Sequence, residues 1–193
     1  MIEERGRLRR LAAALPSYLR IAWWGLAAPR LTEREPLVVH QAVVIGESGV
    51  LLAERDELCG WELPGGAARA GETGEEAVAR EVFEETGVSV RVEGCVADYA
   101  RTGFRPHRAR IYRCRAAGGE PRPSPETPRV AWFDPEALPE TLFPWCRGPL
   151  ADALAPSGAT LERTEHQGAG VVLAALAIDL RTRLRAGRRE SGR

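Results

Sequence analysis

The chain has 193 residues, which is enough for one compact domain with additional terminal segments. Its 27 lysine and arginine residues balance 27 acidic residues, so no overall positive field favours a nucleic acid or another polyanion as a partner. All 27 of these basic residues are arginine, and asparagine is also absent, which we interpret as a genome composition bias rather than an adaptation to phosphate.

The cysteines indicate a reducing compartment. They are far apart in the sequence, form no CxxC pair and follow no secretory signal: Cys59, Cys95, Cys114 and Cys146. We therefore expect reduced structural thiols in a cytoplasmic protein. Cys59 lies near the candidate active site described below, but no histidine is near it in sequence, so we expect no nucleophilic role for it.

Residues 1–35 are expected to form an N-terminal helical extension, in which arginine alternates with leucine, alanine and aromatic residues. Pro16 predicts a break between two short helices. Trp23 and Trp24 beside basic residues are also typical of helices on a membrane surface, whereas Pro16 and Arg20 exclude a membrane-spanning helix. Such segments more often pack on their own domain or on a second subunit. We therefore expect no membrane contact and keep a homodimer as an alternative.

Residues 36–157 are expected to form the main domain, which opens with a β-hairpin. The run LVVHQAVVIG at residues 37–46 is typical of a buried strand. Residues 47–49, Glu-Ser-Gly, predict a turn, and VLLAER at residues 50–55 predicts the second strand.

Residues 66–88, GAARAGETGEEAVAREVFEETGV, predict a loop followed by a helix. Thr73 precedes Glu76 at the spacing of a capping box, so the helix should begin near Gly74. Gly87 can adopt the left-handed conformation that ends a helix, so the helix should end near Thr86.

This helix should have an apolar face and an acidic face. A step of about 100° per residue gathers the apolar side chains of Val78, Ala79, Val82 and Phe83 on one arc. The opposite arc carries three carboxylates, from Glu81, Glu84 and Glu85. Like charges at this spacing repel by a few tenths of a kcal/mol per pair, which favours a divalent cation among them. Ligation by oxygen alone indicates Mg²⁺ or Mn²⁺ rather than Zn²⁺. A solvated acidic helix face is the alternative.

The same stretch resembles a complete Nudix box, and residues 61–66, WELPGG, resemble the strand and turn that precede the box in that family. The resemblance implies an α/β fold, an α/β/α sandwich around a mixed β-sheet, flanked here by the N-terminal and C-terminal helical segments. Matched position by position, the implied metal ligands are Glu81, Glu84 and Glu85. Glu72 and Arg80 would form the ion pair that fastens the loop to the helix, and Gly66 would let the backbone approach a phosphate or a metal.

A basic stretch follows the box. Residues 88–100 predict a long strand, residues 100–110 a turn-containing loop and residues 111–115 another strand. The basic side chains of this loop could bind a diphosphate or a terminal phosphate: Arg101, Arg105 and Arg108 first, with His107 and Arg110. Phe104 or Tyr99 could stack on a base. An exposed polar hairpin with no role in binding is the alternative.

Residues 116–129 contain glycines and four prolines and predict a loop. Glu126 lies just before the apolar run at residues 130–133, where some family members hold an additional carboxylate that faces the metals. It is therefore the first candidate for a fourth ligand or a general base, with Glu120 and Asp98 as alternatives.

The C-terminal part is expected to be helical. Asp134 before Pro135 predicts a short helix, and another should begin near Gly148. Residues 158–186 form a C-terminal helical segment that packs on the domain or on a second subunit. Residues 187–193 are expected to be a disordered tail.

The family resemblance implies metal-dependent hydrolysis of a nucleoside diphosphate linked to another moiety X. Mg²⁺ or Mn²⁺ would activate the water, and Glu84, Glu81 or Glu126 would act on its proton. A nucleotide sugar, ADP-ribose or a nucleoside triphosphate could each be the small-molecule substrate. Two other readings stay open: a double-bond isomerase that uses a similar box, and a non-catalytic nucleotide sensor. Retention of every box carboxylate favours catalysis over the sensor.

Overall fold

The computed structural model describes residues 37–55, 57–156 and 158–190, together with Leu15, Pro16, Tyr18, Leu19 and Trp23. Most of the N-terminal extension expected at residues 1–35 lies outside the described residues, so the two short helices stay a prediction. No helix among the described residues has the length and apolar character needed to cross a membrane.

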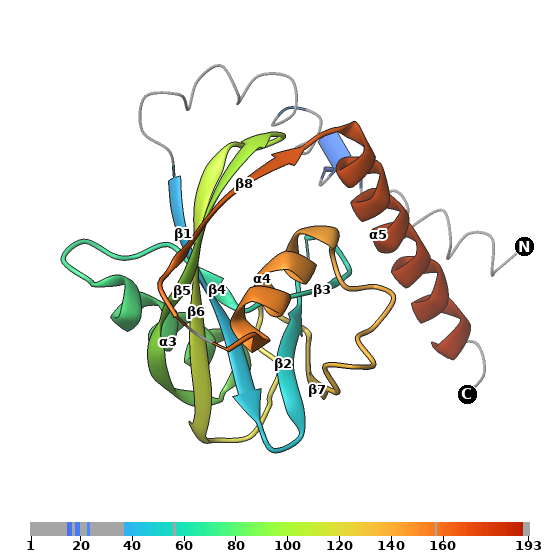
Figure 1. Ribbon diagram of the computed structural model, residues 1–193. Helices are drawn as coiled ribbons and strands as arrows, with labels where there is room; N and C mark the ends of the chain where they lie inside the picture. Colours follow the sequence, from blue (N-terminus) through green and yellow to red (C-terminus); the bar gives the residue numbers. More distant parts are fainter. Residues whose placement is uncertain are drawn as a thin grey trace, which may run out of the picture.

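A mixed β-sheet forms the centre of the protein (Figure 1). Its strands are β1 (Leu37–Gly46), β2 (Gly49–Glu54), β3 (Trp61–Glu62), β4 (Gly65–Gly66), β5 (Ser89–Gly103), β6 (His107–Gly118), β7 (Arg129–Phe133) and β8 (Leu161–Gln167). The order in the described sheet is β3-β2-β1-β6-β5-β8, with β4 paired to β1 and β7 paired to β2. The β1–β6 and β5–β8 pairs are parallel and the remaining pairs are antiparallel, so the predicted mixed sheet is confirmed.

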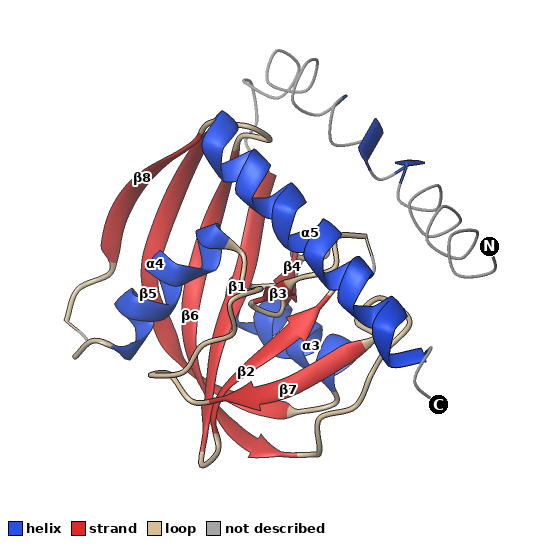
Figure 2. Ribbon diagram, turned by 90° about the vertical axis from the view of Figure 1, so that its right-hand side faces the viewer, coloured by secondary structure: helices blue, strands red, loops and turns tan. Residues whose placement is uncertain are grey.

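Helices cover both faces of this sheet, as expected for an α/β/α sandwich. They are α3 (Gly74–Thr86), α4 (Pro144–Leu154) and α5 (Ala169–Glu190). Figure 2 shows α4 and α5 in front of the sheet and α3 behind it. Alternate residues of β1 feed the two cores: Val43 joins the core beside α4, whereas Ala42 and Val44 join the core beneath α3.

The opening hairpin agrees with the sequence, because β1 and β2 pair antiparallel around a turn at residues 47–48, with Gly49 already part of β2 opposite Gly46. The basic stretch differs. Residues 101–103 continue β5 and residue 107 already begins β6, so the expected loop at residues 100–110 is the tight end of a hairpin. Both strands are long because they pair along most of their length, from Arg101 opposite His107 back to Ser89 opposite Gly118.

The C-terminal half differs from the expectation in four places. Pro135 and Pro139 leave too few residues for a helix after Asp134, whose carboxylate accepts the Glu136 amide at 2.9 Å in a turn. Helix α4 begins at Pro144, not near Gly148, since a proline fits the first helical position.

Residues 161–167, expected to belong to a helical segment, form strand β8 instead. Its sequence LERTEHQ is mostly exposed and polar, so no apolar alternation marks it, and it is held by parallel pairing with β5. Helix α5 continues to Glu190, past the expected start of a disordered tail at residue 187, because alanine, arginine and glutamate favour helix. Residues 191–193 lie outside the described residues.

Candidate active site

The loop and helix of the box are held by local interactions. The Thr73 hydroxyl accepts the Glu76 amide at 3.2 Å, and the Glu76 carboxylate accepts the Thr73 amide at 2.8 Å. Gly87 ends the helix with a φ of 74°, in the left-handed region that favours glycine. The predicted bounds of α3, Gly74 to Thr86, are therefore confirmed.

Arg80 connects the loop to the helix through Glu72. Its Nε and Nη2 atoms donate to the two carboxylate oxygens of Glu72 at 2.8 and 2.9 Å, a bidentate arrangement. Nη2 also donates to the Ala67 carbonyl at 3.2 Å. The bonds from Arg80, and then from the Arg69 amide, lower the pKa of Glu72 to about 2, so this carboxylate stays charged throughout the neutral range.

Two of the three acidic side chains meet at the same guanidinium nitrogen. Arg80 Nη1 donates to Glu81 at 2.8 Å and to Glu84 at 3.1 Å. Arg69 Nη2 donates to both oxygens of Glu84, at 3.0 and 3.1 Å. Glu81 also lies against Gly66, where an added Cβ atom would be 2.5 to 2.8 Å from the carboxylate. Gly66 therefore gives the Glu81 carboxylate its space, and any larger residue would displace it.

Glu85, the third acid, is buried. Its Oε2 atom accepts the Gly65 amide at 2.9 Å, and its Oε1 atom lies 3.5 Å from Arg55 Nη2. Burial raises the pKa of Glu85 to about 7, although Arg55 and the Gly65 amide act in the opposite direction. With its pKa near neutrality, the Glu85 carboxyl group would lose its proton more readily when a cation binds beside it.

The faces of α3 differ in part from the helical projection. Phe83, expected on the packing face, is 46% exposed, and Arg122 lies 5.6 Å from its ring centroid. Ala77 and Glu85 are buried instead. The reason is that β4 covers the acidic side of the helix, so burial is not confined to its apolar arc.

The chemistry of these donors fits a hard divalent cation. Carboxylate oxygens are the ligands that Mg²⁺ and Mn²⁺ prefer, and the box supplies them at Glu81, Glu84 and Glu85 beside a turn of two glycines. Within the described residues, no three acidic, cysteine or histidine side chains are already arranged around one ion position. Glu81 and Glu84 point at Arg80 instead, so ion binding would require them to turn from the arginine.

A cavity of about 210 Å³ is connected to the buried acid through Arg55. Arg55 lines it, contacts Glu85 and pairs with Glu62, which also lines it. The other walls come from the start of β1, the loop between β2 and β3, the end of β5, the β5–β6 turn with the start of β6, the beginning of α4 and the end of β8: Leu37, Val39, Gln41, Glu57, Leu58, Arg101, Phe104, Arg105, His107, Trp145 and Gln167. A ligand in this cavity could therefore extend toward the box carboxylates.

The structure separates the three arginines expected to bind substrate. Arg101 and Arg105 line the cavity. Arg105 has a φ of 50° at the β5–β6 turn, a conformation that a non-glycine residue rarely adopts. Arg108 is not among the cavity residues and pairs with Asp98 at 2.8 Å instead. The alternation along β6 explains the difference, because Arg108 and His107 point to opposite faces of the sheet.

Arg101 is only 4% exposed, so it links neighbouring elements inside the protein and is not a solvent-exposed charge. It donates to Glu165 at 2.9 Å and to the Trp145 carbonyl at 2.7 Å. Trp145 lies four residues before Pro149, which has no amide hydrogen, so this carbonyl lacks its partner within α4. Arg101 supplies the missing donor and thereby joins α4 to β5 and β8.

Glu126 lies exposed in the loop between β6 and β7, and no hydrogen bond or ion pair joins it to the box acids. Its neighbour Thr127 is buried and donates its hydroxyl to the backbone carbonyl of Glu85. The loop is therefore attached to the C-terminal end of α3. Of the two alternatives, Asp98 is buried and paired with Arg108 and Arg110, and Glu120 is exposed.

Sequence reasoning did not find Arg55, Glu62, Gln41, Trp145 or Gln167. Arg55 and Glu62 flank the predicted strand and turn, where a charged pair beside an apolar run was a usable signal. Gln41 is an amide within a buried strand, which was a second signal, because a buried polar group requires a partner. No sequence signal marked Trp145 or Gln167, because only the fold brings them to the cavity.

The comparisons with known proteins agree with this architecture. The family model of the NUDIX domain matches residues 36–154. A MutT-like protein of Streptomyces ambofaciens is 39% identical over 136 residues, which cover 69% of this chain and 88% of that protein. A putative 8-oxo-dGTP diphosphatase of Bacillus subtilis (strain 168) is 32% identical over 103 residues, which cover 53% of this chain and 69% of that protein.

A solved structure supports the same assignment. The crystal structure of an ADP-ribose pyrophosphatase from Streptococcus suis 89-1591 aligns with a TM-score of 0.56 and 26% identity, covering 67% of this chain and 99% of that one. The family match covers the whole sheet except β8 and includes α3 with its three acids. The chain therefore belongs to the Nudix hydrolase family and is a Nudix pyrophosphohydrolase.

Proposed function

We propose that the protein hydrolyses the pyrophosphate bond of a nucleoside diphosphate linked to another moiety X, with Mg²⁺ or Mn²⁺ as the metal. The observation that carries the proposal is the position of the box acids beside strand β4. Glu85 accepts the Gly65 amide, Glu81 lies against Gly66, and Glu84 shares Arg80 with Glu81. Once Glu81 and Glu84 turn from Arg80, three carboxylates beside this glycine backbone would supply oxygen ligands for a hard divalent cation.

In this proposal Glu81, Glu84 and Glu85 hold the metal. When bound, the metal would neutralise the charge on the diphosphate oxygens and lower the pKa of the attacking water. Arg80 fixes the helix to the loop through Glu72, and Gly66 keeps the space beside Glu81. Arg101 and Arg105 stay candidates for substrate contact because they line the adjoining cavity, whereas the position of Arg108 supports a structural pair with Asp98.

Glu84 and Glu126 remain the two candidates for the general base. Glu84 is the more exposed of the box acids, with 46% of its side chain accessible, so its oxygens can reach a water at the site. Glu126 is also exposed, on a loop attached through Thr127 to α3. No contact joins Glu126 to the box acids among the described residues, whereas Glu84 is one of them, so we favour Glu84.

The relatives named above support two substrate classes: nucleoside triphosphates, through the 8-oxo-dGTP diphosphatase, and ADP-ribose. Nucleotide sugars belong to the same chemical class of diphosphates. The products would be a nucleoside monophosphate and a phosphorylated X, or a monophosphate and pyrophosphate if X is itself phosphate.

The test is hydrolysis of a panel of nucleoside triphosphates, ADP-ribose and nucleotide sugars with Mg²⁺, with Mn²⁺ and with chelator. Glu84→Gln should lower kcat by at least about 100-fold, because removing a metal ligand or base removes stabilisation made in the transition state. Glu75→Gln, on the exposed first turn of the same helix, is the matched control and should retain activity. Equal activity of Glu84→Gln and Glu75→Gln, or full activity in chelator, would refute the proposal. Nucleotide binding without turnover would favour a sensor.

A further inference from the structure

Two neutral amides line the cavity that Arg55 connects to Glu85. Gln41 on β1 is 8% exposed and Gln167 at the end of β8 is 6% exposed, and both line the cavity. Among the described residues, the side chain of Gln41 has a single hydrogen-bond partner, Arg101, and that of Gln167 has none. In the described part of the chain, no fully buried side-chain nitrogen or oxygen lacks a hydrogen-bond partner. The open amide groups of Gln41 and Gln167 therefore reach the space of the cavity, where a ligand with complementary polar atoms can bind them.

The orientation of Gln41 is set by chemistry. Arg101 Nη1 lies 3.4 Å from Gln41 Oε1, and a guanidinium group can only donate hydrogen bonds. The oxygen of the amide must therefore face Arg101, which leaves the NH₂ group of Gln41 for the cavity. Arg101 is itself fixed by Glu165 and by the Trp145 carbonyl, so it cannot easily turn away.

His107 does not compete for this NH₂ group. Its Nδ1 atom lies 2.7 Å from the Arg105 carbonyl and must donate, so Nε2 is the accepting nitrogen. That acceptor faces Arg101 Nη1 at 3.4 Å. The NH₂ group of Gln41 is therefore left to donate to a ligand in the cavity.

The remaining lining suits an uncharged, flat group. Three positive residues at the cavity are balanced by three acids at or beside it: Arg55, Arg101 and Arg105 by Glu57, Glu62 and Glu165. Little net charge is therefore left to attract another phosphate. Phe104 and Trp145 supply aromatic surface, and Trp145 is held by stacking on Phe143 with ring centroids 4.6 Å apart. Flat rings with hydrogen-bonding edges are the part of a nucleotide that fits such a lining.

We propose that this cavity binds the base of the nucleotide and that Gln41 determines which bases fit. Because Gln41 offers the ligand only its NH₂ donor, it selects bases that present a carbonyl oxygen over bases that present an amino group at the same place. This inference rests on the proposed function for the identity of the ligand. An amino group opposite the Gln41 NH₂ would leave two donors facing each other with no acceptor, and such a mismatch discriminates strongly between ligands.

The experiment compares substrates that differ by an oxo or amino group and by the proton on the ring nitrogen beside it. Inosine and adenosine triphosphates differ by an oxo or amino group on the same ring carbon, and uridine and cytidine triphosphates form a second such pair. The wild-type protein should prefer the oxo member of at least one pair by about tenfold in kcat/KM. The same triphosphates are also titrated by calorimetry in chelator, so the affinity ratio is obtained even if nothing is hydrolysed.

Three variants locate the cause. Gln41→Glu should reverse the preference, because one carboxylate oxygen would pair with Arg101 and the other would offer an acceptor to the amino base. Gln41→Leu should abolish the preference. Gln167→Leu is the matched control: its amide has no fixed orientation and can offer either group, so its loss should weaken both members of a pair and keep their ratio. Thermal unfolding of each variant checks that it folds.

The outcomes separate this inference from the proposed function. Hydrolysis with equal rates for oxo and amino substrates, or an unchanged preference in Gln41→Glu, would overturn the role of Gln41 and indicate that the cavity takes X. Absence of hydrolysis combined with a tenfold affinity ratio in chelator would support the role of Gln41 while removing the catalytic proposal.

Discussion

At Gly66, the absence of a Cβ atom should affect the catalytic rate more than the stability of the protein. Its backbone does not have a positive φ, so alanine is allowed there, but the added methyl group would push the Glu81 carboxylate aside. Gly66→Ala should therefore fold and lose about 100-fold in kcat, as expected when a catalytic group is displaced by about 1 Å. Steady-state kinetics and circular dichroism check the two parts.

A second glycine gives the control for this substitution. An added Cβ atom at Gly118 would meet no atom within 4 Å, and this residue also has no positive φ. Gly118→Ala should keep full activity. If both alanine variants were equally active, the close approach of Gly66 to Glu81 would have no bearing on catalysis.

His107 should make the stability of the protein dependent on pH. Burial, and then Arg101 and Arg105, hold the pKa of His107 below its usual 6.5. As the pH falls below about 6.5, the unfolded chain binds a proton there first, so the free energy of unfolding decreases. The free energy of unfolding of the wild type minus that of His107→Asn should therefore decrease from pH 7.5 to pH 5.

Urea denaturation at several pH values measures this difference, and the imidazole titration followed by NMR provides an independent check. A wild-type-minus-variant value that stays constant or increases toward pH 5 would contradict the direction of the His107 pKa shift. The stabilisation from a neutral His107 is fully present above its unfolded pKa and is lost on acidification.

At the residue scale, the box could be read from the sequence because its interactions are local. The Thr73–Glu76 cap and the Glu72–Arg80 pair join residues three and eight positions apart. Arg101 could not be assigned in the same way. Its partners Gln41 and Glu165 lie 60 and 64 positions away, so an arginine expected to contact phosphate is a buried link between strands and a helix.

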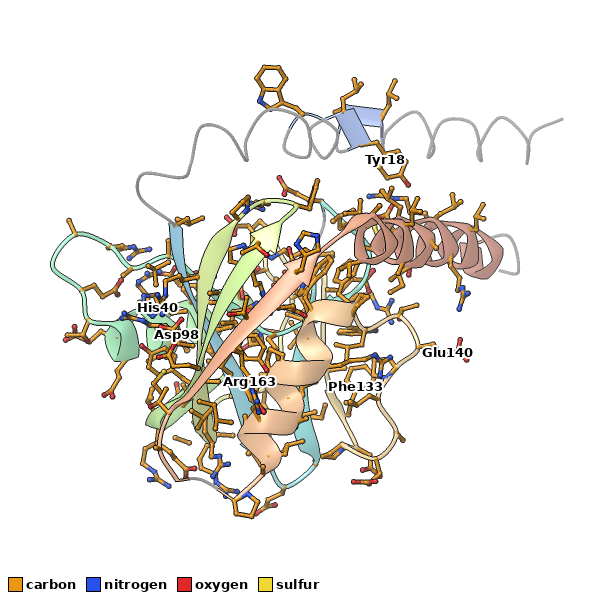
Figure 3. All side chains as sticks on the ribbon, turned by 45° about the horizontal axis from the view of Figure 1, so that its top comes forward. Tyr18, His40, Asp98, Phe133, Glu140 and Arg163 are labelled. Atoms are coloured by element: carbon orange, nitrogen blue, oxygen red, sulfur yellow. The ribbon has the colours of Figure 1, made fainter. Side chains whose placement is uncertain are left out.

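At the scale of elements, α5 is fastened to the cavity wall by one buried carboxylate. Asp179, which is fully buried, accepts the Cys59 amide at 2.7 Å and the Tyr18 hydroxyl at 2.6 Å. Arg183 donates to the same carboxylate at 2.9 Å and to the Glu57 carbonyl at 3.2 Å. Figure 3 shows Tyr18 pointing toward α5. Burial, together with Asp179, raises the pKa of Tyr18 to about 12, which keeps its hydroxyl a donor.

Asp179→Ala should destabilise the protein by about 2 to 4 kcal/mol, because it leaves buried donors and one arginine without their acceptor. It should also speed hydrogen exchange at the Cys59 amide, next to the cavity residue Leu58. Chemical denaturation at neutral pH and exchange followed by mass spectrometry measure the two effects.

Arg181→Ala on the same helix is the control, because its contact with Glu140 is 3.4 Å long and both side chains are more than half exposed. A surface pair of this kind contributes little, and we expect a change within about 0.5 kcal/mol. Equal destabilisation by the two substitutions would show that Asp179 does not fasten α5.

The elements that could be predicted from the sequence are those marked by a local sequence pattern. The β1–β2 hairpin has apolar runs around a turn, and α3 has a cap at each end. Strand β8 has neither, because it lies at the end of the sheet with most side chains in solvent, and only pairing with β5 makes it a strand. Helix α4 contains Pro149 and is completed by Arg101 from β5, a contribution that no local pattern contains.

At the scale of the whole molecule, the α/β/α layers were predicted from the family resemblance and could not be predicted from the residue pattern alone. Both cores draw residues from strands and helices throughout the chain, so which face each helix covers depends on long-range pairing. The four cysteines agree with the expectation of free thiols, and two of them, Cys114 and Cys146, are buried within the cores. The cavity could not be predicted, because its walls come from six separate segments of the chain.

Strand β8 has a consequence for how the protein behaves at high concentration. It lies beyond residue 154, where the family match ends, and it covers the edge of β5 from Ala97 to Gly103. An uncovered strand edge is a template for pairing with another molecule, whereas an edge strand rich in charge resists such pairing. Glu162, Arg163 and Glu165 place both signs of charge on β8. The segment outside the family match is therefore expected to set the protein's resistance to aggregation, a property separate from its catalysis.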